Sequence, residues 1–600
     1  MAFYNFRGIM HQLHLVPAPR ATHHFGGSCP RHTDLHEVID PSLEPEAYRL
    51  EIVVSHIQIA AADVRGLAYG RTTLEQIRAQ CADELPQLRI DDAPCYPVRG
   101  LYHDVSRGKV PTLSTLLELA DICARLKLNQ LQLYIEHTYA YVAFPEVWQD
   151  ADPLTAEEIR TLDAHCASLH IELVPSFSTF GHFYNFLRQK RFAHLNEMEC
   201  DLSLESFNWF DRMHQTLDCS HPESIQLVST LIREVRPLFR SNQFNICADE
   251  TFELGEGKNR AKALALGKGR LYLDFVKQII EIVHACGSRP MMWGDIIQEH
   301  PALLSEIPPD VTLLEWGYAA TIETAAMQAL QEQHRPFFVC SGTQAWNRFL
   351  PDYPRARENI SNMATEGFRH RASGYLVTDW GDFGHIAPLA ASLPSIAYAA
   401  ACAWNVAQSC DRPDAVEHAI SLHLFNDPTG QLLRHLNQAA SVTFPIWHGL
   451  ALWKQPRPVN TPDSWFDPRS GIADELLKTH RIEDHLEALR AFAPARHACL
   501  AQLESIAILP KDGDDLRVAL LGTEICHELG ALLFDLADRN PQNLPVPEIG
   551  YVVDRLKLLE TEITRIWLAR NKRSELIRIS ELLQAIADDL LKRLQSPASL

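Results

Sequence analysis

The sequence lacks the features that mark membrane, secreted and disulfide-bonded proteins. No stretch approaches the roughly 18 to 20 consecutive apolar residues needed to cross a bilayer, and the first 20 residues lack the apolar segment of a secretory signal. The 14 cysteines are scattered and no two form a C-x-x-C pair, which favours reduced, buried thiols. We therefore expect a soluble, cytoplasmic protein.

Positive charge is also scarce. The chain carries 55 Lys and Arg against 76 Asp and Glu, a net charge of −21. This balance disfavours nucleic acid or an anionic membrane as a partner and favours a neutral or cationic small substrate.

Motifs for common cofactors are missing as well. The G-x-G-x-x-G turn of dinucleotide-binding sheets and the phosphate-binding P-loop spacing are absent. The first strand of the predicted barrel carries only His103, not the His-x-His pair of a metal-dependent amidohydrolase. We therefore expect no cofactor and no catalytic metal, although a metal hydrolase stays open as a third option.

The hydrophobic pattern divides the chain into three parts. Residues 1 to about 43 show little periodicity and are expected to be irregular, whereas strand-like alternation followed by helical spacing predicts a small α/β domain that ends near residue 95. Residues 411–600 show apolar residues three and four apart and are predicted to form a helical domain, which could pair two subunits. A Pro-rich stretch at 454–468 is expected to be a surface loop within it.

Between these parts, residues 96–410 contain eight short apolar runs that alternate with helix-like stretches. The runs begin at residues 99, 128, 171, 244, 289, 311, 336 and 373. Apolar strands buried on both faces, each followed by a helix, are typical of a (β/α)8 TIM barrel. The fold class is therefore predicted to be α/β, with this barrel as the catalytic domain.

The chemistry of such barrels lies at the carboxyl ends of the strands. Acids, tryptophans, two histidines, an arginine and an asparagine follow the eight runs in turn: Asp104 and Arg107; Glu136 and His137; His182; Asp249 and Glu250; Trp293 and Asp295; Glu315 and Trp316; Trp346 and Asn347; and Asp379, Trp380 and Asp382. A lone Trp is more often core and a lone Asp is often a helix cap. Their recurrence at every strand end indicates a carbohydrate site, because indole rings stack on sugars while carboxylates and Arg bind hydroxyls.

One strand end is unusual, because FNICADE places two acids side by side after an apolar run. Burial of one carboxylate is costly and two adjacent ones repel, so stability alone would rarely select Asp249 and Glu250. The pair points to catalysis.

These residues resemble glycoside hydrolase family 20, the β-N-acetylhexosaminidases. ADE matches the end of the family motif H-x-G-x-D-E, VRGLYHDVSR is similar to its first barrel strand, and IEHTYAY, TFGH, GTQAWN and TDWGD resemble a branch related to the hexosaminidase D type. The motif's His and Gly are replaced by Asn245 and Cys247. The resemblance covers roughly residues 48 to 405.

The resemblance implies a role for each matched residue. Glu250 would be the general acid/base and Asp249 would orient the 2-acetamido group of the substrate. Arg99 would hold ring hydroxyls and Asp382 the far hydroxyls. The remaining substrate-binding residues would be Glu136, His182, Trp293, Trp316, Trp346 and Trp380, with Trp346 and Asn347 standing where the family has Tyr and Asp.

The resemblance implies exo-acting removal of terminal β-linked N-acetylglucosamine or N-acetylgalactosamine with retention. Neighbouring carboxylates cannot straddle a sugar as acid and nucleophile, and family 20 is a known exception in which the acetamido oxygen of the substrate attacks. We expect the second carboxylate and the apolar surroundings to raise the pKa of Glu250. The alternative is a sugar-binding protein without catalytic activity, built on the same barrel.

Overall fold

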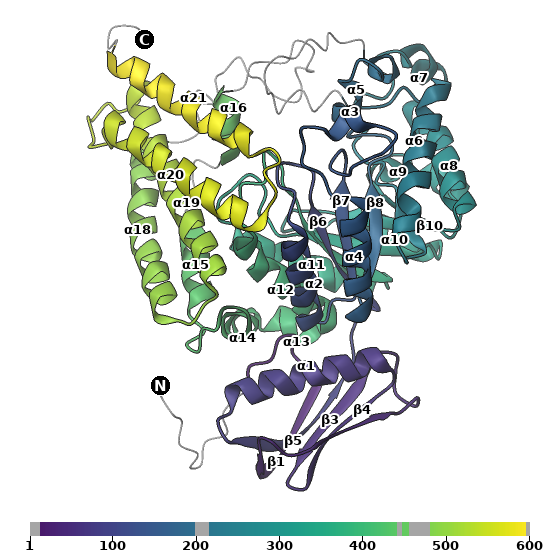
Figure 1. Cartoon of the computed structure of the whole chain (residues 1–600), viewed down its shortest axis with the longest axis vertical. Coiled ribbons are helices and arrows are strands. Elements are labelled where there is room, and N and C mark those ends of the chain that lie inside the picture. The colour runs from purple at the N-terminus through teal and green to yellow at the C-terminus, as the bar shows by residue number, and fades with distance from the viewer. Residues whose placement is uncertain (1–12, 199–214, 441–446, 455–480, 596–600) are drawn as a thin grey trace.

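The computed structural model describes residues 13–198, 215–440, 447–454 and 481–595. The chain forms an N-terminal sheet domain, a central barrel and a C-terminal group of helices (Figure 1). The Pro-rich stretch lies outside the described residues apart from Lys454. Among the described helices, none is both long and apolar enough to cross a membrane.

The N-terminal domain is a five-stranded sheet with α1 (Val64–Gln80) packed on one face (Figure 1). Its strand order is β1-β5-β3-β4-β2. The strands are β1 (Ala21–Pro30), β2 (Leu35–Ile39), β3 (Tyr48–Val53), β4 (His56–Ala61) and β5 (Glu84–Asp92). The expectation of irregular structure is therefore wrong for residues 21–39, which contain two strands. Both β1 and β2 are edge strands with mostly exposed side chains, so they show no apolar alternation.

The central domain is a closed parallel barrel, and each of the eight predicted runs contributes one strand. β13 pairs with β6 and closes the ring. The strands are β6 (Val98–Asp104), β7 (Gln130–Ile135), β8 (Glu172–Phe177), β9 (Gln243–Asn245), β10 (Arg289–Trp293), β11 (Thr312–Trp316), β12 (Phe337–Gly342) and β13 (Gly374–Asp379).

Amphipathic helices cover the outside of the barrel, and their buried residues form one core with the outward faces of the strands. They are α2 (Leu113–Arg125), α3 (Pro145–Trp148), α4 (Ala156–Ser168), α5 (Tyr184–Leu187), η1 (Ala193–Leu195), α6 (Pro222–Val235), η3 (Arg236–Leu238), α7 (Arg260–Leu266), α8 (Lys268–Ala285), α9 (Asp295–Glu299), η4 (Pro301–Glu306), α10 (Ala325–Glu332), α11 (Tyr353–Arg369) and α12 (Leu389–Trp404).

The last part is helical, as predicted. Its helices are α13 (Val406–Asp411), α14 (Pro413–Phe425), α15 (Leu432–Ala440), α16 (Trp447–Lys454), α18 (Ile482–Ser505), α19 (Pro510–Leu536), α20 (Ile549–Arg570) and α21 (Leu576–Gln595). The apolar stripe of α20, which includes Val552, Leu559 and Ile563, is buried against neighbouring helices of the same chain. Pairing of two subunits through this domain stays a prediction.

Arg99 joins the barrel to the N-terminal domain. Its guanidinium is fully buried at the start of β6, where it contacts Glu46 at 2.8 Å and donates to the Tyr69 hydroxyl at 3.0 Å. It also donates to the carbonyl oxygens of Tyr96 and Lys127 at 2.8 and 3.0 Å. These contacts give the buried Arg99 guanidinium hydrogen-bond acceptors and a counter-charge in place of water.

We expect Arg99→Met to lower the free energy of unfolding by about 3 kcal/mol, because it strips buried acceptors of their donor and breaks a buried ion pair. Urea unfolding measures the change. Arg49→Met is the matched control, since the pair of Arg49 with Asp91 is half-exposed and its loss is expected to cost less than about 1 kcal/mol. Equal losses in the two variants would contradict the role of Arg99.

Candidate active site

The side chains predicted at the strand ends gather at the carboxyl-terminal mouth of the barrel. At its centre, His182 lies between the two adjacent acids. Its Nδ1 is 3.8 Å from Asp249 Oδ1 and its Nε2 is 3.4 Å from Glu250 Oε2. His182 and Asp249 are buried, whereas the Glu250 side chain keeps 34% of its exposure. One imidazole therefore bridges two carboxylates, only one of which faces solvent.

The backbone around this pair leaves regular strand geometry. β9 stops at Asn245, whose side chain accepts from the Cys247 N–H at 2.9 Å, and Cys247, Ala248 and Glu250 all have left-handed φ angles of 56°, 65° and 50°. Opposite them, a Cβ on Gly181 would lie 2.6 Å from the Asp249 carbonyl oxygen, so that position needs glycine. The left-handed turn after β9, packed closely against Gly181, places the side chains of Asp249 and Glu250 next to each other.

Asn245 and Cys247, which replace the family's His and Gly, are both buried and bonded. Asn245 Nδ2 donates to Gln132 Oε1 at 2.9 Å. The Cys247 thiol lies 3.4 Å from the Ser176 hydroxyl and 3.6 Å from that of Tyr102, and burial raises its pKa to about 12. The thiol is therefore a neutral packing group below the acid pair.

Charge and burial act differently on the two acids. Burial raises the pKa of Asp249 more than the positive charge of His182 lowers it. Burial also acts to raise the pKa of Glu250, but the hydrogen bond and charge of His182, with the charge of Arg107, outweigh it and hold that pKa below its ordinary value. The expectation of a raised Glu250 pKa is therefore wrong, because the positive charges of His182 and Arg107 outweigh the effect of burial.

The two acids also change the pKa of the His182 imidazole. Burial disfavours its charged form, yet the charge of Asp249 and the contact with Glu250 prevail and raise the pKa of His182. A protonated ring between two carboxylates is the state that these contacts favour.

Two further acids lie behind the pair. Asp295 Oδ2 accepts from the Glu250 backbone N–H at 3.3 Å, and burial, with the charge of Asp249, raises the pKa of Asp295 to about 7. Glu315 is buried beside Gln298, which donates to it, and burial with the charge of Asp295 raises its pKa to about 8. Glu315 is therefore largely neutral at pH 7.

Arg107, rather than Arg99, is the arginine at this mouth. Its guanidinium lies 3.2 Å from Asp382, 3.4 Å from Asp104 and 3.6 Å from Glu136. It also lies 5.0 Å from the ring centroids of both Tyr134 and Trp380. The result is a cation surrounded by three carboxylates, and two of them, Asp382 and Glu136, are predicted substrate-binding residues.

The prediction that Arg99 binds substrate is not supported by its position. It starts β6, whereas Arg107 follows the end of the same strand, so the two side chains lie at opposite ends of the barrel. The Arg99 guanidinium is also occupied by contacts with Glu46 and Tyr69 of the N-terminal domain and with two backbone carbonyl oxygens. Because both arginines belong to RGLYHDVSR, strand direction alone distinguishes them.

The predicted tryptophans form an aromatic wall. Trp293 is buried, with its ring centroid 5.1 Å from that of Tyr102 and 5.9 Å from that of Trp380. Trp316 and Trp346 are half-buried on either side of Tyr318, at centroid distances of 5.2 and 5.0 Å. The structure thus brings Trp316, Trp346 and Trp380 together around one residue that the sequence analysis missed.

That residue is Tyr318. The Trp380 indole N–H donates to its hydroxyl at 2.7 Å, and burial raises the pKa of Tyr318, which keeps the phenol protonated. Its signal in the sequence was its place two residues after Trp316, at the end of the sixth strand.

Among the residues that the structure describes, two groups of side chains lie close enough together to hold a metal ion. One is His182, Asp249 and Glu250, and the other is the more exposed set of His194, His221 and Glu223. In the second set His194 Nε2 lies 3.0 Å from Glu223 Oε2. His221 precedes α6, and its Nδ1 accepts from the backbone N–H of Glu223 in the first turn of that helix. In both sets a histidine already has a carboxylate partner.

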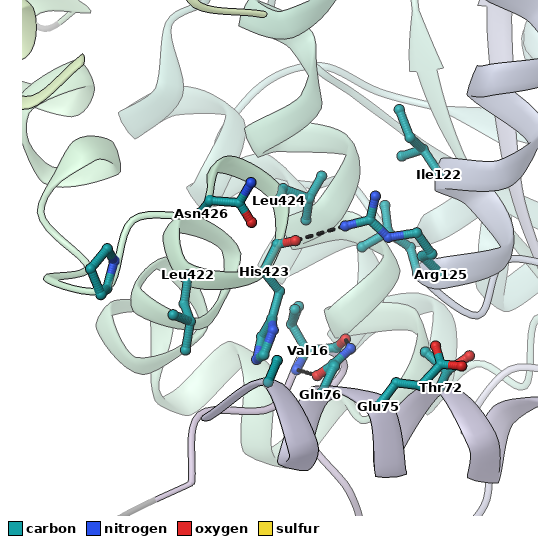
Figure 2. A pocket seen from close by; sticks show the side chains of 13 residues that line it. Val16, Thr72, Glu75, Gln76, Ile122, Arg125, Leu422, His423, Leu424 and Asn426 are labelled. Atoms are coloured by element: carbon teal, nitrogen blue, oxygen red, sulfur yellow. Dashed lines mark hydrogen bonds between the residues drawn. The ribbon is translucent and has the colours of Figure 1, made fainter. Parts of the chain in front are cut away.

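A separate cavity of about 370 Å³ lies where α1, the end of α2 and the end of α14 meet (Figure 2). Arg125 reaches across it and donates to the His423 carbonyl at 2.7 Å, while Gln76 bonds the backbone of Val16. Because α2 runs back from the mouth, its last residues mark the opposite end of the barrel. The cavity is therefore remote from the acid pair.

Family models and curated relatives point to the same family. The model for the glycosyl hydrolase family 20 catalytic domain matches residues 96–346, and that for domain 2 of the same family matches residues 10–93. Hexosaminidase D of Bos taurus is 24% identical over 315 residues, covering 49% of this chain and 87% of the relative. Hexosaminidase D of Homo sapiens is 25% identical over 319 residues, covering 49% and 62%.

Solved structures share the fold. An exo β-N-acetylglucosaminidase from Vibrio harveyi, in complex with N-acetylglucosamine, has a TM-score of 0.57 at 17% identity and covers 72% of this chain and 79% of its own. A chitobiase from Flavobacterium johnsoniae has a TM-score of 0.56 at 16% identity and covers 96% of this chain and 99% of its own.

The buried position of Glu315 makes a pH-dependent prediction about stability. Because its pKa rises from 4.5 to about 8 on folding, the native state holds a proton that the unfolded state releases, so wild-type stability falls as pH rises from about 4.5 to 8. Glu315→Gln removes this loss, and we expect the variant to gain on wild type by up to roughly 4 kcal/mol over that range.

Urea unfolding at pH 5 and pH 8 measures this gain. Glu281→Gln, at an exposed position of α8, serves as the control and should show the same difference from wild type at both pH values. A constant difference for Glu315→Gln would contradict the raised pKa.

Proposed function

The chain belongs to glycosyl hydrolase family 20 and is a glycoside hydrolase of the β-N-acetylhexosaminidase type, and we propose that it removes terminal β-linked N-acetylglucosamine or N-acetylgalactosamine by retaining, substrate-assisted catalysis. The observation that carries the mechanism is the adjacency of Asp249 and Glu250 around one imidazole. Acids this close cannot flank a glycosidic bond as acid and nucleophile, which leaves the nucleophile to the substrate.

In the first step, the acetamido oxygen of the substrate forms a bond to the anomeric carbon as the bond to the leaving oxygen breaks. Glu250 gives its proton to that oxygen. Asp249 accepts a hydrogen bond from the acetamido N–H and balances the positive charge of the cyclic intermediate. In the second step, Glu250 takes a proton from water as the water attacks the anomeric carbon and reopens the ring.

Substrate binding is expected to change the pKa values of both acids. The pKa of Asp249 is raised and that of Glu250 is lowered by their protein surroundings. An acetamido N–H donating to Asp249 favours its ionised form, and a sugar covering the exposed part of Glu250 removes water from it and raises its pKa. Binding therefore moves the preferred proton site towards Glu250.

The remaining residues divide between the two sides of the sugar. Arg107, with Asp382 and Glu136, presents charged donors and acceptors suited to hydroxyl groups. On the other side, Trp293, Trp316, Trp346 and Trp380 wall the space for the acetamido group, and the Tyr318 hydroxyl is suited to donate to the acetamido oxygen because it already accepts from Trp380. Tyr318 thus takes the place of the family tyrosine expected after the seventh strand.

We also propose a cytoplasmic location, supported by the free thiol state of every cysteine among the described residues. A sugar-binding protein without turnover is the second candidate. It is disfavoured because a site that only binds sugar has no need for two adjacent acids that contact one imidazole.

Glu250→Gln tests the assignment of the general acid. We expect kcat/KM for an aryl β-N-acetylglucosaminide to fall about 10²- to 10⁴-fold, because the amide has no proton to give. Glu256→Gln, an exposed acid in the same loop, should keep wild-type rates. Near-normal turnover by Glu250→Gln would refute the assignment, and binding without turnover by wild type would favour the second candidate.

His182→Gln tests the electrostatic role of the imidazole. His182 lowers the pKa values of both acids, so its loss should raise both. Activity needs Asp249 ionised and Glu250 protonated, and we therefore expect the acidic and the alkaline limbs of the kcat/KM profile to move to higher pH. Assays from pH 4 to 9 measure the profile, and unchanged limbs would argue against coupling through His182.

A further inference from the structure

The connection between α20 and α21, residues 571–575, packs against the loop that follows β6 (Figure 1). Asn571 forms an isolated antiparallel bridge with Pro111, and the Lys572 backbone N–H donates to the Val110 carbonyl at 2.8 Å. The Ser574 hydroxyl donates to the Gly108 carbonyl. A segment of the C-terminal domain therefore holds the loop that carries Arg107.

A line of buried acidic and basic side chains runs from this segment into the site. Glu575 Oε1 lies 3.8 Å from His137 Nε2, and His137 Nδ1 lies 3.9 Å from Glu136 Oε2. Glu136 Oε1 in turn lies 3.6 Å from Arg107 Nε. Glu575, His137 and Glu136 are all buried, and Arg578 holds Glu575 from its far side at 3.1 Å. Acidic and basic groups alternate along the line, so each side chain helps to orient its neighbour.

The same domain also holds the other side of Arg107. The Trp447 indole of α16 donates to the Phe383 carbonyl at 2.9 Å, next to Asp382, which contacts Arg107 at 3.2 Å. Both loops that supply the proposed hydroxyl site thus rest on helices beyond residue 346, where the family's catalytic model ends.

We infer that Glu575 is a positioning residue that fixes the sugar-binding geometry of Glu136 and Arg107 through His137. The inference rests on the proposed function, because it assigns Arg107 and Glu136 to the hydroxyl groups of the sugar. Without the Glu575 carboxylate, His137 loses one of its two carboxylate contacts and is held less firmly beside Glu136, whose Oε1 still accepts from the Tyr134 hydroxyl at 3.0 Å. We expect the main effect on sugar binding, because the contacts of Asp249 and Glu250 with His182 do not include this line of residues.

Glu575→Gln tests the inference, with Asp512→Asn as the matched control. Asp512 is a buried acid of the same domain that pairs with Arg570 and does not reach His137. We expect Glu575→Gln to raise KM for an aryl β-N-acetylglucosaminide, and Kd for the N-acetylglucosamine thiazoline, about tenfold, with kcat within about twofold of wild type. Asp512→Asn should lower the unfolding temperature and leave KM and Kd unchanged.

A double-mutant cycle with Glu136→Gln separates positioning from general loss of structure. Because both residues act on Arg107 in one line, the double variant should bind only as weakly as Glu136→Gln alone. Unchanged KM and Kd in Glu575→Gln, or multiplicative effects in the double variant, would overturn the inference.

The same experiment distinguishes failure of the proposed function. A wild-type protein that binds the thiazoline without cleaving the glycoside would refute the function, while the Kd values of the variants would still decide the role of Glu575. A wild-type protein that neither binds nor cleaves would refute both.

Discussion

The contact of one imidazole with two adjacent carboxylates is the interaction on which the rest of the site depends. Asp249 and Glu250 repel each other, and burial adds to that cost, so the pair needs the positive charge of His182 between them. The left-handed turn after β9 brings the acids together, and the glycine at 181 lets the opposing loop approach them. Backbone strain and charge repulsion are both concentrated where chemistry requires them.

The wider site distributes charge in the same way. Asp295 and Glu315 lie behind the acid pair with pKa values raised to about 7 and 8, while Arg107 lies before it among Asp104, Glu136 and Asp382. Positive charge thus lies on the side proposed to bind the sugar hydroxyls, and the acids with raised pKa values lie on the side of the core. The C-terminal helices keep Arg107 in this arrangement, so a domain outside the family's catalytic model contributes to the site.

The barrel could be predicted because strands buried on both faces appear as continuous apolar runs, and the acid pair because adjacency in sequence is adjacency in space. Long-range features could not. The contacts of Arg99 with Glu46 and of Arg107 with Asp382 join residues far apart in the sequence, and no local pattern shows them. The approach of Glu575 to His137 depends on the packing of α20 and α21, for which no local pattern exists. Edge strands such as β1 lacked alternation because both of their faces are largely exposed.

The central claim is that the substrate supplies the nucleophile. Its most direct measurement is kcat/KM for aryl β-glucosaminides whose N-acyl group changes from acetyl through difluoroacetyl to trifluoroacetyl. Fluorine withdraws electrons from the attacking oxygen, so the account predicts that kcat/KM falls steeply along the series and that thiazoline inhibits the acetyl reaction. Equal rates along the series would show that the acyl oxygen takes no part, and would contradict the account.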